Sequence, residues 1–400
     1  MTRLTSSVRL ATSWMATVIA LCLAVPVVGQ RASDPAVSRR ASDIVLGMSA
    51  ALSGPSAQLG RGVRLGVEAY LKRVNDSGGI GGRLLRLVAL DDSYQSDPVK
   101  NNMLRLIDQE KVLAVIGSVG TAGAGVSVPI ANERNVLFFG AFSGAEILRR
   151  QPPDHYVINL RASYAEETGV MVRGLFARGI KPEQIAFFTQ NDGYGDSGYA
   201  GAIQAIRDLG YPNMTFTHGR YERGTLDVED AVLAIVQAKS RPRAVIMVGA
   251  YAATAKFVKL TKQVVPNATF LSVSFVGATA LTEALGKDGE GVIVTQVVPH
   301  PESDLPGIAE YRAAIRRYTP NAQYEFISLE GYLIAKTFVE GLRRVRGDLT
   351  RDSIVDAIEH AGTLDIGIGV PLKYSPAEHQ GSHHVWLTVI RGGKLVPFDW

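Results

Sequence analysis

Cysteine is almost absent from this chain, which has a single one, Cys22, among its 400 residues. We expect that cysteine to be lost with the N-terminal segment described below, so the mature protein has no thiol chemistry and no disulfide bond. Its stability must therefore come from the burial of apolar side chains. At this length we expect two or three domains, each large enough for a core of its own.

An excess of one sign of charge is also absent. The 42 lysine and arginine residues nearly balance the 38 aspartate and glutamate residues, which leaves a formal net charge of +4. Loss of Arg3 and Arg9, the only charges of the N-terminal segment, lowers this to +2. A nearly neutral surface of mixed sign does not favour a nucleic acid or an anionic membrane as a partner.

Long apolar runs are rare, and the one that approaches a membrane-spanning length is Trp14–Val28. It follows Arg3 and Arg9, and no acidic residue occurs before Asp34. This pattern predicts a secretory signal peptide over residues 1–29. A membrane anchor is the alternative, but the run is shorter than the ~20 apolar residues that a span needs.

Catalytic motifs are missing as well. The chain has no G-x-S-x-G, no G-x-x-x-x-G-K-[ST] and no H-E-x-x-H, and the glycine-rich run Gly117–Gly125 lacks the G-x-G-x-x-G spacing. Asp91-Asp92 would point to opposite faces of a strand, which favours a role in a turn over acid–base catalysis. We expect no enzyme, no cofactor and no metal, although one histidine cluster near the C-terminus could bind a metal: His379, His383 and His384.

What the chain does contain is a repeated alternation of apolar strands and amphipathic helices. It runs through a first block that begins with the strand Ile44–Ala50, pauses at the proline-containing segment Arg149–Asp154, and resumes with a helix around Glu166–Ala177. Such alternation with short loops predicts an α/β fold with parallel, helix-covered sheets. After the strand Val292–Val298 we expect three helices and a two-stranded finish: Ile308–Tyr318, Phe326–Arg344, Thr350–His360, then Val385–Ile390 and Lys394–Phe398.

Small, hydroxyl-bearing or aromatic residues follow six of the predicted strands. In a parallel sheet these ends share one edge, where ligands bind and where helix N-termini offer free N–H groups to a carboxylate. Because three of the loops lie in each block, we expect a cleft between two lobes, although ordinary turn and capping chemistry explains any single loop. The loops are Ser53–Gly60, Ser118–Gly123, Phe142–Ala145, Asn191–Gly195, Gly249–Tyr251 and Ser274–Gly277.

Several motifs resemble the periplasmic leucine/isoleucine/valine-binding protein family, in order along nearly the whole mature chain. They are IVLGMSAALSGPSAQLG at Ile44–Gly60, NDSGGIGGR, LDDSYQSDP, GSVGTAGAG and QNDGYGDSG. The resemblance implies a type 1 periplasmic binding fold, in which two Rossmann-like lobes joined by three crossovers open and close around a solute. It also implies a monomer in the periplasm that needs no cofactor and delivers its solute to an inner-membrane ABC permease.

The domain boundaries that we expect combine this resemblance with the pattern of elements. A flexible lead-in at residues 30–42 follows the signal peptide. Residues 43–161 and 299–373 form the first lobe, and residues 162–298 and 374–400 form the second.

The resemblance further implies a set of ligand contacts. Thr121 corresponds to the serine that holds the ligand carboxylate and keeps its hydroxyl group, while Ser274 stands where the family has the carboxylate that pairs with the ligand ammonium. Either another acid replaces that charge, with Asp192 and Glu325 as candidates, or the ligand has no ammonium group, which we favour. The expected binding residues are Ser53, Leu59, Thr121, Phe142, Ser143, Gly144, Tyr194, Tyr251 and Ser274.

The sequence therefore predicts a solute-binding protein for a small polar or carboxylate-bearing molecule. A ligand sensor with the same fold is the first alternative, because it needs the same cleft. An enzyme on a Rossmann-like scaffold is the second, and the missing motifs argue against it.

Overall fold

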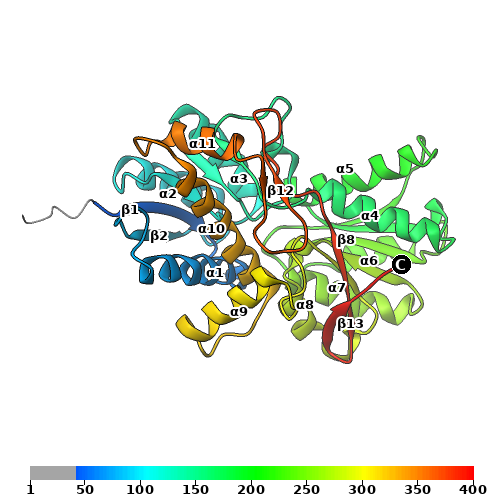
Figure 1. Cartoon of the computed structure of the whole chain (residues 1–400). Coiled ribbons are helices and arrows are strands. Elements are labelled where there is room, and N and C mark those ends of the chain that lie inside the picture. The colour runs from blue at the N-terminus through cyan, green and yellow to red at the C-terminus, as the bar shows by residue number, and fades with distance from the viewer. Residues whose placement is uncertain (1–41) are drawn as a thin grey trace, which may run out of the picture. The chain divides into compact units, whose positions relative to one another are not determined.

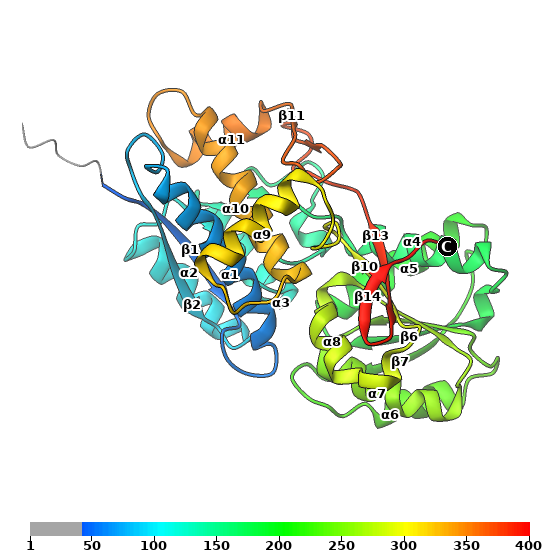
Figure 2. The same cartoon turned by 60° about the horizontal axis from the view of Figure 1, so that its bottom comes forward.

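The computed structural model describes residues 42–400, so the predicted signal peptide and nearly all of the predicted lead-in lie outside the described residues. Strands and helices alternate along this part of the chain and form two α/β lobes with parallel sheets and flanking helices (Figures 1 and 2). This arrangement confirms the predicted fold class.

The first lobe is built on a five-stranded sheet in the order β2-β1-β3-β4-β5, in which every pair is parallel. Its inner strands are buried on both faces, which explains why they are nearly continuous apolar runs in the sequence. The elements are β1 Ile44–Ala50, α1 Ala57–Asp76, β2 Leu85–Asp91, α2 Ser96–Asp108, β3 Ala114–Ile116, α3 Thr121–Glu133, β4 Leu137–Phe139, the 3-10 turn η1 Glu146–Leu148 and β5 Val157–Ile158.

The second lobe has a seven-stranded sheet in the order β14-β13-β10-β9-β8-β6-β7. It is parallel from β10 to β7. Its elements are α4 Tyr164–Ala177, the 3-10 turn η2 Pro182–Gln184, β6 Ile185–Gln190, α5 Gly193–Asp208, β7 Thr217–Tyr221, α6 Glu229–Val236, β8 Ala244–Val248, α7 Tyr251–Val264, β9 Thr269–Ser272, the 3-10 turn η3 Ser274–Val276, α8 Ala278–Leu285, the 3-10 turn η4 Gly286–Gly289 and β10 Ile293–Gln296.

After β10 the chain returns to the first lobe as three helices, α9 Pro306–Tyr318, α10 Phe326–Arg344 and α11 Arg351–Glu359. Helix α10 packs closely on α1 because small residues allow the two backbones to approach. A Cβ atom added at Gly66 would lie 1.8 Å from the carbonyl oxygen of Ser328. These helices lie where the sequence predicts them and complete the first lobe.

The last segment ends in the two-stranded hairpin that the sequence predicts. After the short pair β11 Thr363–Leu364 and β12 Leu372–Lys373, the hairpin β13 Trp386–Arg391 and β14 Lys394–Pro397 does not stand alone. It extends the second sheet, because β13 pairs antiparallel with β10. The chain thus passes between the lobes three times, after β5, after β10 and before β13.

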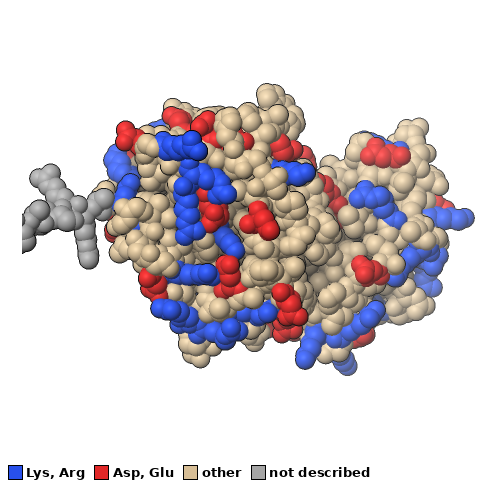
Figure 3. All heavy atoms as spheres, in the orientation of Figure 1, with Lys and Arg blue, Asp and Glu red and all other residues tan. Residues whose placement is uncertain are grey.

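The surface carries no large field of one sign on the face that Figure 3 shows, where acidic and basic side chains are interspersed among uncharged ones. None of the helices within residues 42–400 is both long and apolar enough to cross a membrane.

Candidate functional site

A strained turn at the end of β2 directs an aromatic side chain toward the second lobe. Ser93 and Tyr94 both have positive φ angles, 49° and 62°, which residues other than glycine rarely adopt. Asp91 accepts a hydrogen bond from the backbone N–H of Ser93 (2.9 Å), and Asp92 accepts one from that of Tyr94 (2.9 Å). The neighbouring acids therefore hold a turn, and backbone strain of this kind clusters at functional sites.

Hydrogen bonds at the same turn lower the pKa of Asp91. Burial acts to raise the pKa of Asp91, but hydrogen bonds from Ser53, Ser93 and Leu52 lower it to about 2. Ser53, one of the expected binding residues, thus serves here as a partner of Asp91 through both its backbone and its hydroxyl group.

Phe275 lies at the centre of four aromatic rings from both sides of the interface between the lobes. Its side chain is 1% exposed, and it sits in the turn η3 that follows β9. We call the four surrounding residues the aromatic cage. The distances between their ring centroids and that of Phe275 are 6.4 Å for Tyr94, 5.4 Å for Phe142, 6.3 Å for Tyr164 and 4.7 Å for Tyr194.

Hydroxyl groups gather beside this cage at the N-terminus of α3. Thr121 Oγ1 and Ser143 Oγ are 2.8 Å apart and both side chains are buried. Gly120 precedes the helix and has no side chain to cap it, so the first N–H groups of α3 face the interface without a cap. We call Thr121, Ser143 and Tyr164 the hydroxyl cluster; Tyr164 lies against the same loop, because its backbone N–H donates to the carbonyl oxygen of Gly144, the residue after Ser143.

The Tyr164 hydroxyl group has unused hydrogen-bonding capacity. It is buried and has no partner among residues 42–400. Burial raises the pKa of Tyr164, while the Arg161 charge and the hydroxyls of Ser143 and Thr121 act to lower it. The hydroxyl therefore stays protonated near neutral pH and can donate to a ligand oxygen.

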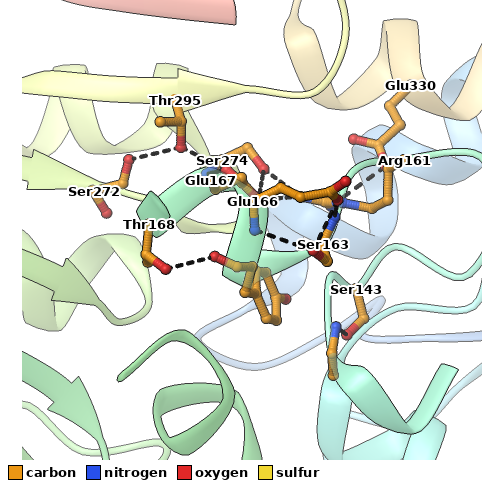
Figure 4. A network of polar contacts seen from close by, with 12 residues as sticks. Ser143, Arg161, Ser163, Glu166, Glu167, Thr168, Ser272, Ser274, Thr295 and Glu330 are labelled. Atoms are coloured by element: carbon orange, nitrogen blue, oxygen red, sulfur yellow. Dashed lines mark hydrogen bonds and ion pairs between the residues drawn. The ribbon is translucent and has the colours of Figure 1, made fainter. Parts of the chain in front are cut away.

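A buried ion network borders the cage, since Arg161 lies against the rings of Phe142 and Tyr164. Figure 4 shows Arg161 with Glu167, Ser274 and Glu330. Arg161, in the first passage between the lobes, is 3.2 Å from Glu167 of α4 and 3.4 Å from Glu330 of α10, and all three side chains are almost fully buried. Arg161 also donates to Ser274 Oγ. The network therefore joins elements of both lobes to the segment that connects them.

Glu167 is the acid that stands beside Ser274. Its carboxylate accepts hydrogen bonds from the Ser274 backbone N–H (2.7 Å), from Ser274 Oγ (3.0 Å), from Thr295 Oγ1 and from Arg161. A carboxylate has about four acceptor positions, so this set uses all of them.

Neither acid named from the sequence stands there. Asp192 caps α5 by accepting from the Tyr194 backbone N–H, and Glu325 precedes α10 without a contact to Ser274.

Glu330 is the member of the network whose charge is least favoured. Burial raises its pKa to about 7, although the charges of Arg161 and Arg149 act to lower it. Glu167 adds to the rise because it is a second buried carboxylate. At neutral pH the carboxyl group of Glu330 is therefore partly protonated.

The remaining expected residues have contacts of their own around the same region. Leu59 packs against Gly277, where an added Cβ would lie 2.8 Å from Leu59 Cδ2. The Tyr251 hydroxyl donates to the carbonyl oxygen of Pro55. Gly144 contacts Tyr164, whose backbone N–H donates to its carbonyl oxygen at 2.8 Å.

Sequence reasoning missed five residues that shape this region: Tyr94, Arg161, Tyr164, Glu167 and Phe275. Phe275 follows Ser274 in one of the six loops that are predicted to line the cleft, so the sequence does indicate its region. Tyr164 and Glu167 look like ordinary residues of a helix. Their importance depends on contacts across the lobes, which local patterns do not report.

A shallow groove opens at the edge of the interface, beside the hydroxyl cluster. Its volume is about 490 Å³, and α3, η1 and α5 contribute its walls. Most of the lining is apolar or small, and the two acids lie at its exposed rim. The residues are Thr121, Ala122, Gly125, Ala145, Glu146, Ile147, Gly193, Asp196 and Ser197.

The three C-terminal histidines do not converge. His379 lies 2.8 Å from Glu359, His383 lies 2.6 Å from Glu166, and His384 packs on Trp386. Within residues 42–400 there is no group of three or more histidine, cysteine or acidic side chains placed to hold a metal ion.

A family model described as periplasmic binding protein matches residues 43–394. With two α/β lobes and this match over most of its length, the chain belongs to the periplasmic binding protein family. A Brucella abortus protein named Leu/Ile/Val-binding protein homolog 7 is 26% identical over 329 residues, which cover 76% of this chain and 78% of the relative.

Two further comparisons confirm the resemblance that the motifs indicate. The Leu/Ile/Val-binding protein of Escherichia coli is 24% identical over 261 residues, covering 64% of this chain and 68% of the relative. The crystal structure of a possible leucine/isoleucine/valine-binding protein from Rhodopirellula baltica is 44% identical, with a TM-score of 0.88, over 91% of this chain and 98% of that one.

Proposed function

We propose that this protein captures a small solute that carries a carboxylate or amide group but no ammonium group, and delivers it to an inner-membrane ABC permease. The observation that carries the proposal is the hydroxyl cluster at the N-terminus of α3, where Tyr164 is buried without a partner. The N-terminus of a helix, with free N–H groups and hydroxyl groups nearby, can bind a negatively charged or polar oxygen atom.

The ion network supports the second half of the proposal. An ammonium group in a buried site needs a carboxylate with free acceptor positions, because an unpaired buried charge costs about 3–5 kcal/mol. Glu167 is the acid beside Ser274, and its acceptor positions are already used by Arg161, Ser274 and Thr295. A zwitterionic amino acid would have to displace one of these partners.

The relatives leave the choice of ligand open. Proteins of the same fold that are 19–22% identical include one from Thermus thermophilus with bound valine, a fatty acid ABC transporter substrate-binding protein from Thermomonospora curvata, and one from R. palustris in complex with benzoate. The fold thus accommodates both amino acids and plain carboxylic acids. The residues of this chain, not the fold, must decide between them.

A thermal-shift screen tests the proposal. The protein is unfolded and refolded to remove any carried-over solute, and then heated with amino acids, amides, and aliphatic or aromatic acids. A bound solute raises the melting temperature, since it stabilises the native state by about 2.7 kcal/mol at a hundredfold excess over its Kd. We expect acids or amides to raise it and amino acids not to. Turnover of the bound solute would instead favour an enzyme.

A sensor of the same fold is the second candidate, and the two differ in the partner. Binding of the loaded protein to a reconstituted ABC permease, with stimulation of its ATPase activity, supports transport. The absence of both effects with a proven ligand would favour the sensor.

A further inference from the structure

The position of Phe275 is unusual for an apolar side chain in a loop. The loop belongs to the second lobe, but two of the rings around Phe275, Tyr94 and Phe142, belong to the first. The side chain therefore fills space between the lobes instead of the core of its own lobe. This is the space on which the expected binding residues Phe142 and Tyr194 also face.

The cage has polar groups that Phe275 cannot satisfy. The hydroxyl groups of Tyr94 and Tyr164 are buried and have no hydrogen-bond partner among residues 42–400, and the same is true of Arg161 Nε. Buried polar groups are nearly always paired, so such groups need an explanation. A phenyl ring offers them no acceptor, whereas a ring with a carboxylate does.

The cation next to the cage points to the same chemistry. The guanidinium carbon of Arg161 lies 5.0 Å from the centre of the Phe142 ring and 5.8 Å from that of Tyr164. Its positive charge and the free donor at Nε can both favour an anionic oxygen at the rim of the cage.

We propose that the ring of Phe275 occupies the solute's own binding position, and that the solute is an aromatic carboxylate whose ring replaces it in the aromatic cage. This inference rests on the proposed function and names its solute class. The ring of the solute would pack among Tyr94, Phe142, Tyr164 and Tyr194. Its carboxylate would accept hydrogen bonds from the hydroxyl cluster.

The loop that carries Phe275 has a glycine on one side of it and an anchored serine on the other. Gly277 ends η3 with a φ angle of 81°, a conformation that glycine adopts at little cost, and Ser274 stays attached to Glu167 through its backbone N–H. The proposed exchange requires the side chain of Phe275 to leave the cage while Ser274 keeps its place.

Fluorine NMR of the wild-type chain tests the exchange directly. The protein is labelled with 4-fluorophenylalanine, and Phe275→Leu identifies the resonance of Phe275. We expect benzoate to shift this resonance in a saturable way, with an affinity at least tenfold higher than that of cyclohexanecarboxylate. No shift with benzoate, 4-hydroxybenzoate or phenylacetate would overturn the proposal, and so would an equal affinity for the saturated acid.

Variants test the same exchange by affinity. Phe275→Ala should bind benzoate at least tenfold more tightly than the wild type, because no side chain has to leave. An engineered cavity can bind small apolar rings by itself, so toluene serves as a neutral probe. Adding Tyr164→Phe should remove the gain for benzoate and leave that for toluene. An equal gain for both probes, insensitive to Tyr164→Phe, would overturn the proposal.

Two controls keep the outcomes distinct. Phe257→Leu changes a buried ring that stacks on Phe188 within the second lobe, and it should leave benzoate binding unchanged. If Phe275→Ala does not fold, the NMR measurement on the wild type decides. If the wild type binds an aliphatic acid or amide but no aromatic acid, this inference fails and the proposed function stands, and if it binds no acid or amide at all, both fail.

Discussion

The hydroxyl cluster and the ion network both border the aromatic cage, and the Tyr164 hydroxyl and the Glu167 carboxylate differ in how much of their hydrogen-bonding capacity is used. In the hydroxyl cluster, Tyr164 is buried without a partner. In the ion network, Glu167 has a partner for every acceptor position. The comparison teaches that a buried polar group marks a binding site only where it has hydrogen-bonding capacity that the protein itself does not use. The Glu167 carboxylate, whose acceptor positions are all used, marks structure instead.

The largest expected effect comes from breaking the ion network. Arg161→Met removes the cation and leaves Glu167 and Glu330 as buried acids without their partner. We expect a loss of about 3–5 kcal/mol in the free energy of unfolding, measured with urea. Arg64→Met is the control, because it removes an exposed pair with Glu68 that contributes at most about 1 kcal/mol. Equal losses for the two variants would show that the network has no structural role.

The pH dependence of stability is a second test of the ion network. The folded-state pKa of Glu330 is about 7, above its ordinary value of 4.5. The contribution of Glu330 to the free energy of unfolding is therefore complete below pH 4.5 and is lost as the pH rises through 7. The difference of 2.5 units corresponds to about 3 kcal/mol.

Glu330→Gln has no such titration, so it isolates this contribution. We expect the stability of the wild type to fall relative to the variant between pH 5 and pH 8. Arg161, Arg149 and Glu167 are neighbours of this side chain in both proteins. Parallel pH profiles would show that Glu330 is ionised throughout.

A smaller effect is expected on the hydroxyl side. Thr121→Val keeps the volume of the side chain and removes its hydroxyl, which should weaken binding of the acid that gives the largest thermal shift by about 1.5–3 kcal/mol. Thr261→Val is a matched control, because Thr261 is also buried but lies in α7, where its hydroxyl has no partner within residues 42–400. Calorimetry should find unchanged binding for the control. A loss of stability without a loss of affinity would make Thr121 a structural residue only.

The sequence predicts the lobes well because their elements depend on local periodicity and turn chemistry. The strand ends at Thr121 and Ser143 could also be found, since small hydroxyl-bearing residues after a buried strand are a local signal. The rest of the site could not be found in this way. Phe275 and Tyr94 meet across the lobes, and Glu167 reaches Ser274 from a helix that is 107 residues away in the chain. No local pattern distinguishes such a glutamate from one that faces solvent.

The cost of an ammonium group is the central claim, and one matched pair of ligands tests it most directly. Leucine and 4-methylpentanoate share the same carbon skeleton and carboxylate, and they differ only in the ammonium group. Calorimetry on protein freed of carried-over solute should show that 4-methylpentanoate binds more tightly, by more than a hundredfold if about 3–5 kcal/mol of unpaired charge is avoided. Sub-micromolar binding of leucine, tighter than that of 4-methylpentanoate, would contradict the account.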